Sequence, residues 1–284
     1  MEQITLSAYA KINLTLSITG KRTDGYHTLE SVMQEISLAD TVTLRPIPSG
    51  ILLSCNWQDI PCDERNLCWK AAKHYLEATG IHGGVAIQLI KKIPHGAGLG
   101  GGSSDAAAVL KGMQALYPSE ADLFPIAESL GADVPFFLKG KTLFCTGIGQ
   151  ELSPVFFLKK RSLFAVIAKN CPGLSTPEIY ALFDQTAPEQ SIRQSEEALR
   201  RVFASPDLSA LFSHVKNDLE IPAVLLRPEI ALLKEEFLHC GAKCAMMTGS
   251  GSAVFALFDS EKSARDCAKY LSQKGTDAFF STLL

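Results

Sequence analysis

The sequence has no excess of charge of either sign and no long apolar run. Its 284 residues include 27 Lys and Arg against 30 Asp and Glu, a formal net charge of −3 at pH 7. A chain with this balance offers no basic surface for nucleic acid or for an acidic membrane. No segment approaches the roughly 18 consecutive apolar residues that a membrane-spanning helix needs. We therefore expect a small-molecule substrate, and neither a nucleic acid nor a membrane as partner.

Cysteine pairs with metal-ligand spacing are also missing. The 8 cysteines are scattered, and none forms a C-x-x-C motif. His239, Cys240 and Cys244 lie close together, but no second pair of ligands accompanies them, so we expect buried or incidental thiols and no metal site. The segment 1–6 lacks the basic region and apolar stretch that mark a secretory leader. These absences predict a reduced, cytoplasmic protein.

Glycine, by contrast, is concentrated in one short segment, where five of the seven residues 96–102 are glycine. The β-branched, apolar segment 85–90 before it predicts a strand. Apolar residues at helical spacing over 105–117 predict a helix after it, with Ser103 or Ser104 as N-cap. Glycines allow a close backbone approach, and the first turn of a helix presents unpaired N–H groups to an anion. The segment is therefore predicted to be a phosphate-binding loop.

Two other phosphate-binding motifs fit this chain less well. The P-loop motif G-x-x-x-x-G-K-[ST] fails because Pro135 stands where its first glycine should precede the segment 140–142. The dinucleotide motif G-x-G-x-x-G is met within 96–101, which makes a nicotinamide-dependent oxidoreductase an alternative. That motif needs a second strand ending in an acidic residue about 20 positions on. Residues 118–122 lead instead into another predicted helix, which weakens this alternative.

The rest of the chain predicts a mixture of helices and strands, an α+β fold. An irregular, Pro-containing junction follows residue 168, so we expect two domains, 1–168 and 169–284. Strands are expected at 2–19 with a break at 8–11, at 28–44 with a turn near 39–40, and at 143–146, 163–168, 253–258 and 278–283. Helices are expected from 63 to a stop at Gly80, at 119–130, over much of 178–240, and at 261–274.

Three segments resemble motifs of one known family. Residues 94–104 (P-H-G-A-G-L-G-G-G-S-S) match the signature P-x-x-x-G-L-G-[GS]-[GS]-S-[SA] of the GHMP kinases at every position. Residues 8–14 (A-Y-A-K-I-N-L) resemble the first motif of that family, and residues 248–255 (T-G-S-G-S-A-V-F) resemble the third. The resemblance therefore covers both ends and the middle of the chain.

This resemblance implies an ATP-dependent kinase with the two-domain α+β GHMP kinase fold. Its N-terminal domain would be similar to domain 2 of ribosomal protein S5, and its C-terminal domain would be the α+β GHMP kinase C-terminal domain. Mg²⁺ would arrive with ATP and keep several waters, with no protein ligand assigned. Asn66 would contact adenine, although a helix N-cap is an alternative for it. The expected ATP-binding residues are Pro94, Gly96, Gly98, Leu99, Gly100, Gly101, Gly102, Ser103, Ser104 and Asn66.

Two charged residues are implied as catalytic. The family pairs a lysine with an aspartate that acts as general base, and Lys11 and Asp133 match these positions. Lys11 would keep Asp133 ionised and the substrate hydroxyl oriented. By pattern alone, Lys11 would be a surface lysine of a strand and Asp133 a capping residue. A carboxylate within the apolar segment 132–138 is more often functional or paired than idle.

Further segments point to one branch of the family. The segments 25–27 (G-Y-H), 100–102, 131–135 and 217–220 resemble a branch that phosphorylates the 2-hydroxyl of a cytidine diphosphate-linked methylerythritol in the non-mevalonate (MEP) isoprenoid pathway. Tyr180 would lie against the cytosine, although core packing is an alternative for it. The expected substrate-binding residues are Asn13, Tyr26, His27 (mainly through its backbone), Thr176, Tyr180, Gly249 and Ser250.

Two alternatives stay open within this resemblance. One is another small-molecule kinase of the family, of the homoserine or mevalonate type, and the segment 25–27 argues against it. The other is a non-catalytic member that binds ATP and a ligand as a sensor. The presence of both Lys11 and Asp133 argues against a sensor.

Overall fold

The computed structural model describes residues 3–155, 163–186, 196–205 and 207–284. Its contacts divide the chain into two compact units, each assembled from several segments. Unit 1 contains the residues up to Ala10 together with Ala39–Ile93 and Gly100–Gly140. Unit 2 contains Lys11–Leu38, Pro94–Leu99 and Lys141–Leu284. The long strands β1 (Ile4–Lys21) and β2 (His27–Ile47) contribute residues to both units.

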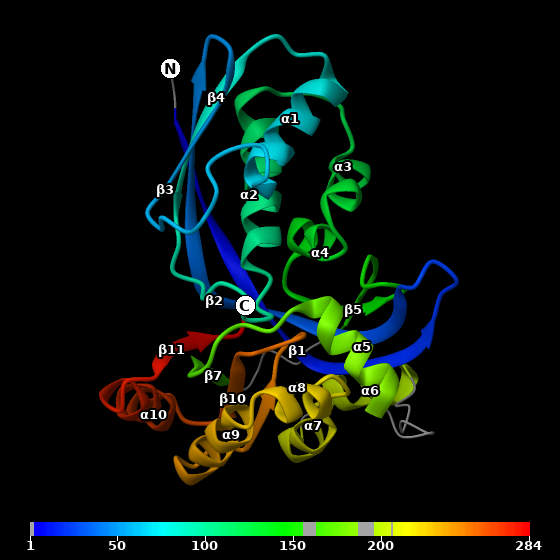
Figure 1. Cartoon of the computed structure of the whole chain (residues 1–284), viewed down its shortest axis with the longest axis vertical. Helices are drawn as coiled ribbons and strands as arrows, with labels where there is room; N and C mark the ends of the chain where they lie inside the picture. Colours follow the sequence, from blue (N-terminus) through cyan, green and yellow to red (C-terminus); the bar gives the residue numbers. More distant parts are fainter. Residues whose placement is uncertain (1–2, 156–162, 187–195, 206) are drawn as a thin grey trace. The chain divides into compact units, whose positions relative to one another are not determined.

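Unit 1 combines a sheet with a group of helices. Residues 41–47 of β2 pair antiparallel with β4 (Gly84–Ile90), and β4 pairs in parallel with β3 (Gly50–Cys55). The helices α1, α2 and α3 pack against one another beside these strands (Figure 1). The helices of this unit are α1 (Leu67–Thr79), α2 (Gly101–Leu116), α3 (Leu123–Leu130) and α4 (Val134–Lys139).

The local sequence explains the bounds of α1. The Asn66 side chain accepts a hydrogen bond from the Cys68 N–H at 2.9 Å, which caps the first turn. Gly80 ends the helix with a φ of 66°, a left-handed conformation that glycine adopts without strain. Tyr75 is fully buried, and its hydroxyl donates to the Tyr117 carbonyl at the end of α2 at 2.6 Å. This bond ties α1 to α2.

Unit 2 is built on an antiparallel sheet in the order β11-β7-β10-β9. Its central strands, β7 (Phe164–Lys169) and β10 (Val254–Phe258), are almost entirely buried. The outer strands are β9 (Cys244–Met247) and β11 (Asp277–Thr282). The helices α9 (Glu229–His239) and α10 (Glu261–Gln273) pack on this sheet (Figure 1). The resulting core includes Val166, Ala256, Phe237 and Leu271.

The remaining described elements of unit 2 are three short strands, connected by pairing to β1 or β2, and four helices. Residues 31–34 of β2 pair with β5 (Thr142–Thr146), which pairs with β6 (Glu151–Pro154). Residues 15 and 16 of β1 pair in parallel with β8 (Lys216–Asn217). The other helices described in this unit are α5 (Thr176–Thr186), α6 (Glu196–Ala204), α7 (Leu208–His214) and α8 (Glu220–Leu226).

The expected α+β composition is confirmed, but several expected bounds are wrong. β1 has no break at 8–11, and β2 has no turn at 39–40, because Asp40 is buried within the strand and bonded there. The segment after Asp133 forms the short helix α4. The predicted boundary at residue 168 stays a prediction, since the compact units interleave along the chain.

The predicted N-cap of α2 is also wrong. Neither Ser103 nor Ser104 caps the helix, because it already begins at Gly101 and Gly100 occupies the cap position. Gly100 has a φ of 70°, and its carbonyl accepts the first helical hydrogen bond from the Ser104 N–H at 2.9 Å. A glycine at positive φ therefore turns the loop into the helix without a side-chain cap.

Candidate active site

The glycine-rich loop joins β4 to α2, as predicted. Gly96, Gly98 and Gly100 adopt φ values of 60°, 72° and 70°, so alternate positions lie in the left-handed region. Because α2 begins at Gly101, the N–H groups of its first three residues have no acceptor within the helix. Together with the positive end of the helix dipole, these groups form an arrangement suited to a phosphate.

Gly98 allows a close backbone contact within unit 2. A Cβ atom built on Gly98 would lie 2.1 Å from the carbonyl oxygen of Thr248, a distance at which something must shift. A Cβ on Gly249 would lie 2.8 Å from the carbonyl oxygen of Gly98. The loop segment 94–99 and the segment 248–251 are therefore packed backbone against backbone. This contact requires glycine at both positions.

Lys11 lies buried beside this contact, with 3% of its surface exposed. Its Nζ atom donates to the Gly98 carbonyl at 2.9 Å and to Asn13 Oδ1 at 2.6 Å, and its N–H donates to the Leu99 carbonyl at 3.0 Å. The surface alternative for Lys11 is wrong. Lys11 and Asn13 are two residues apart on β1, so both side chains lie on one face of the strand.

Asn13 is held in place from three sides. Its Nδ2 donates to Ser31 Oγ at 2.8 Å, and its N–H donates to Thr248 Oγ1 at 3.1 Å. Thr248 Oγ1 in turn lies 3.3 Å from Asn13 Oδ1. Lys11, Asn13, Gly98 and Thr248 thus form one hydrogen-bonded group, which joins three predicted site residues to the first residue of the third motif.

The segment 217–220 supports Gly249 of the third motif and Met247, which precedes that motif. Asn217 Nδ2 donates to the carbonyls of Met247 at 2.9 Å and Gly249 at 2.8 Å. Glu220 Oε2 accepts from the Met247 N–H at 2.8 Å. The structure also brings Thr176 and Ser250 together, with their hydroxyl oxygens 2.7 Å apart. The sequence singled out 217–220 without a role, and the structure gives it a supporting one.

Asp133 belongs to unit 1 and directly precedes α4. It is half-buried, while Val134, Pro135, Phe136 and Phe137 after it are buried. Its side chain makes no capping hydrogen bond to α4, so the capping alternative is wrong for this helix. Asn66 is the opposite case, because both its side-chain groups are used locally: Oδ1 caps α1 and Nδ2 donates to the Pro61 carbonyl at 2.8 Å.

Tyr180 and Asp184 of α5 contact the side chain of His27. The His27 ring is stacked on Tyr180 with centroids 4.8 Å apart, and its Nε2 lies 2.6 Å from Asp184 Oδ1. Lys21 Nζ lies 2.5 Å from Asp184 Oδ2, and hydrogen bonds from Lys21 and His27 hold the pKa of Asp184 below its usual value. Tyr26 is 62% exposed.

Tyr180 also packs against the buried core of unit 2, as the core-packing alternative predicts. Sequence reasoning missed Asp184. Its spacing is the signal that was available, because Asp184 follows Tyr180 by four residues and so shares a face of α5.

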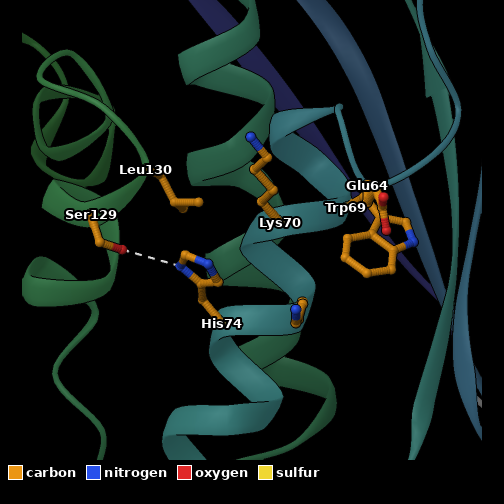
Figure 2. Close-up of a pocket in the computed structure, with 7 residues that line it drawn as sticks. Glu64, Trp69, Lys70, His74, Ser129 and Leu130 are labelled. Carbon is orange, nitrogen blue, oxygen red and sulfur yellow. Dashed lines mark hydrogen bonds between the residues drawn. The ribbon is translucent and has the colours of Figure 1, made fainter.

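Unit 1 also contains a surface pocket of about 410 Å³ between α1 and α3. Figure 2 shows His74 pointing toward Ser129, with Nδ1 and Oγ 3.1 Å apart. None of the predicted site residues is among those that line it: Glu64, Trp69, Lys70, Lys73, His74, Ser129 and Leu130.

The part of the chain that the structure describes lacks both a ready-made metal site and a membrane-spanning helix. No group of three His, Cys, Asp or Glu side chains among them is suited to hold a metal ion. None of the helices in the part of the chain that the structure describes is long and apolar enough to cross a membrane.

Known proteins match this chain over nearly its whole length. Residues 66–141 match the GHMP kinases N terminal domain, and residues 195–277 match the GHMP kinases C terminal domain. The 4-diphosphocytidyl-2-C-methyl-D-erythritol kinase of Clostridium kluyveri is 40% identical over 279 residues, which cover 97% of this chain and 98% of the relative. That of Acetivibrio thermocellus is 38% identical over 280 residues, covering 98% and 97%.

Solved structures agree with these relatives. A crystal structure of 4-(cytidine 5'-diphospho)-2C-methyl-D-erythritol kinase has a TM-score of 0.81 at 39% identity and covers 99% of both chains. A homoserine kinase from Cytophaga hutchinsonii has a TM-score of 0.76 at 22% identity, covering 100% of this chain and 95% of that one, which shows a shared fold. The chain therefore belongs to the GHMP kinase family and, within it, groups with the 4-diphosphocytidyl-2-C-methyl-D-erythritol kinases.

Proposed function

We propose that this protein transfers the γ-phosphoryl group of ATP to the 2-hydroxyl of 4-diphosphocytidyl-2-C-methyl-D-erythritol, a step of the MEP pathway. The relatives named above support this substrate. The single observation that carries the proposal is the buried Lys11, whose ammonium is bonded to the glycine loop through the Gly98 carbonyl. A buried ammonium at a phosphate-binding loop suits chemistry in which negative charge must be stabilised. The ATP-rich cytoplasm is the location we propose.

Phosphoryl transfer asks the protein mainly for positioning and charge stabilisation. In the proposed reaction the substrate 2-oxygen forms a bond to the γ-phosphorus, the bond from that phosphorus to the β,γ-bridging oxygen breaks, and ADP leaves. The hydroxyl proton passes to the Asp133 carboxylate as general base. The N–H groups of the first turn of α2 bind phosphate oxygens, and the Lys11 ammonium offsets the charge that develops.

Mg²⁺ enters this proposal as part of the nucleotide substrate. The described residues offer no cluster of side chains built for a metal ion. Mg²⁺ commonly keeps several waters and binds through substrate phosphates, so phosphate oxygens and water would supply most of its ligands here.

The cytidine end of the substrate is proposed to bind near His27. The imidazole is already held by Asp184 and Tyr180, which leaves recognition of the cytosine edge to the backbone of His27. The exposed ring of Tyr26 supplies a stacking surface. Asn13, Thr176, Gly249 and Ser250 are proposed for the rest of the substrate, which agrees with their hydrogen-bonded arrangement in unit 2.

A substrate panel tests the proposal. The purified chain is incubated with Mg·ATP and either 4-diphosphocytidyl-2-C-methyl-D-erythritol, homoserine or mevalonate, while ADP release is followed by a coupled assay. We expect turnover with the cytidyl substrate alone, and a new phosphate monoester on its methylerythritol unit by ³¹P NMR. Turnover of homoserine or mevalonate, and not of the cytidyl compound, would contradict the proposed substrate and favour another kinase activity of the family. Tight binding of the cytidyl compound without any turnover would favour the sensor alternative.

A further inference from the structure

One cation faces two buried carboxylates in unit 1. Lys91, just after β4, is 6% exposed, and Asp40 and Asp105 are 0% and 2% exposed. The Lys91 Nζ atom contacts an oxygen of Asp40 and lies 2.6 Å from Asp105 Oδ2. Burying a second carboxylate against a single ammonium is costly unless every oxygen is satisfied or one group is neutral. We call Lys91, Asp40 and Asp105 the charge cluster.

The two carboxylates are not equally satisfied. Asp40 Oδ1 accepts from the N–H groups of Lys92 at 2.5 Å and Ile93 at 2.8 Å. Asp105 Oδ1 is buried and has no hydrogen-bond partner among the described residues. A carboxylate with a buried oxygen that no donor reaches costs far more than a neutral carboxylic acid in the same place. The geometry therefore favours a proton on Asp105.

The charge cluster lies directly beneath the first turn of α2. Asp105 is the fifth residue of that helix, and a Cβ built on Gly101 would lie 3.3 Å from Lys91 Nζ. The backbone of Lys91 is fixed by Asn56, whose Oδ1 accepts from the Lys91 N–H at 2.7 Å. The same helix end presents the N–H groups that we assign to phosphate. The net charge of the cluster therefore changes the electrostatic energy of an anion bound at this helix end.

The other titratable groups that face Asp105 do not balance its charge. Cys68 of α1 and Cys55 of β3 also interact with Asp105, and burial raises the pKa of both thiols, which keeps them neutral. Burial raises the pKa of Asp105 to about 7; the attraction of Lys91 opposes this rise, and the negative charge of Asp40 adds to it. The cluster is thus neutral when Asp105 is protonated, and carries one negative charge when it is not.

We propose that Lys91, Asp40 and Asp105 are positioning residues for the first turn of α2, and that ATP binds more tightly while Asp105 is protonated. Ionisation of Asp105 places a negative charge behind the N–H groups that meet the phosphates, and repulsion weakens binding. Linkage works in both directions, so binding of the nucleotide draws a proton onto Asp105. This inference rests on the proposed use of the glycine loop for ATP.

Calorimetry with the whole chain tests the proposal, using a non-hydrolysable ATP analogue with saturating Mg²⁺ at pH 6, 7 and 8. We expect the affinity of the unaltered protein to fall by about 3–10-fold from pH 6 to pH 8. Asp105→Asn, which fixes the neutral state, should bind with nearly constant affinity. Asp266→Asn removes an exposed carboxylate from α10 and should keep the pH dependence of the unaltered protein. Equal pH profiles for the unaltered protein and Asp105→Asn would overturn the proposal.

A second measurement needs no variant, in case Asp105→Asn fails to fold. Titrations of the unaltered protein at pH 7 in buffers with different ionisation enthalpies give the number of protons taken up on binding. We expect net uptake, and no uptake or a release would overturn the proposal. These titrations contain no cytidyl substrate. A protein that binds the nucleotide with the expected profile but does not phosphorylate that substrate would therefore contradict the proposed function alone.

Discussion

The Nζ atom of Lys11 donates a hydrogen bond to the carbonyl oxygen of Gly98 at 2.9 Å, across 87 positions of sequence. The same ammonium donates to Asn13, so it fixes both a strand residue and the loop. Replacement of Lys11 with Met should lower kcat by about 10²–10³-fold, the usual effect of removing one charge-stabilising donor. Lys262→Met, on an exposed position of α10, is the control. A variant with reduced thermal stability but unchanged kcat would show that Lys11 serves only the fold.

Asp133 is predicted to act as general base. Asp133→Asn should lower kcat by about 10²–10⁴-fold, since the amide cannot accept the hydroxyl proton. The affinity for Mg·ATP, measured by calorimetry, should change little. Asp266→Asn is the matched control for the same chemical change at an exposed position. If kcat persists in Asp133→Asn, another group accepts the proton.

A comparison of variants at Gly98 and Gly241 distinguishes the cost of backbone strain from the cost of a steric clash. Both have positive φ, 72° and 86°, but a Cβ on Gly241 would meet nothing within 4 Å. Gly241→Ala should cost about 1–2 kcal/mol of stability, the ordinary penalty for a left-handed alanine. Gly98→Ala should cost more and also weaken nucleotide binding, because its Cβ must displace the segment at Thr248. Chemical denaturation and calorimetry measure the two effects. Similar losses in both variants would mean that the contact at Thr248 yields easily.

Replacement of Tyr26 or Asp184 should raise KM for the cytidyl substrate and leave KM for ATP unchanged. Tyr26→Ala should raise KM for that substrate by an amount equivalent to about 1–3 kcal/mol of lost stacking. Asp184→Asn should raise the same KM by loosening His27. Steady-state kinetics with each substrate varied in turn provides the measurement. An increase in KM for ATP alone would indicate that these residues belong to the ATP site and not to the cytidine site.

The charge cluster also predicts how stability changes with pH. The pKa of Asp105 is raised to about 7 in the folded chain, whereas it is about 3.9 in an unfolded one. The folded state therefore holds a proton that the unfolded state loses, so this stabilisation is complete below pH 4 and disappears as the pH rises through 7. Thermal denaturation of Asp105→Asn should lack this component between pH 4 and 7. Parallel curves for the variant and the unaltered protein would contradict the raised pKa.

The glycine loop could be predicted because its signal is local. Glycine spacing, the strand before it and the helix after it all lie within 85–117. The N-cap prediction failed within the same stretch, because serine is a common cap and the conformation of Gly100 cannot be read from composition. Local sequence thus predicted the elements and missed the geometry of their junction.

Contacts between distant segments could not be predicted in this way. Asp40 was expected in a turn, yet it is buried because Lys91 reaches it from 51 positions away. The burial of Lys11 likewise depends on a carbonyl in a loop that no local pattern connects to it. The family resemblance indicated that Lys11 matters, but not which atoms surround it.

The interleaved course of the chain limits how its parts can be exchanged. The backbone passes from one unit to the other after residues 10, 38, 93, 99 and 140. A chimaera that takes unit 1 from a relative must therefore replace three separate gene segments, and a single crossover always mixes both parents within one hydrophobic core. Recombination among relatives should then yield folded proteins mainly where all three segments of unit 1 are exchanged together, since each core then comes from a single parent.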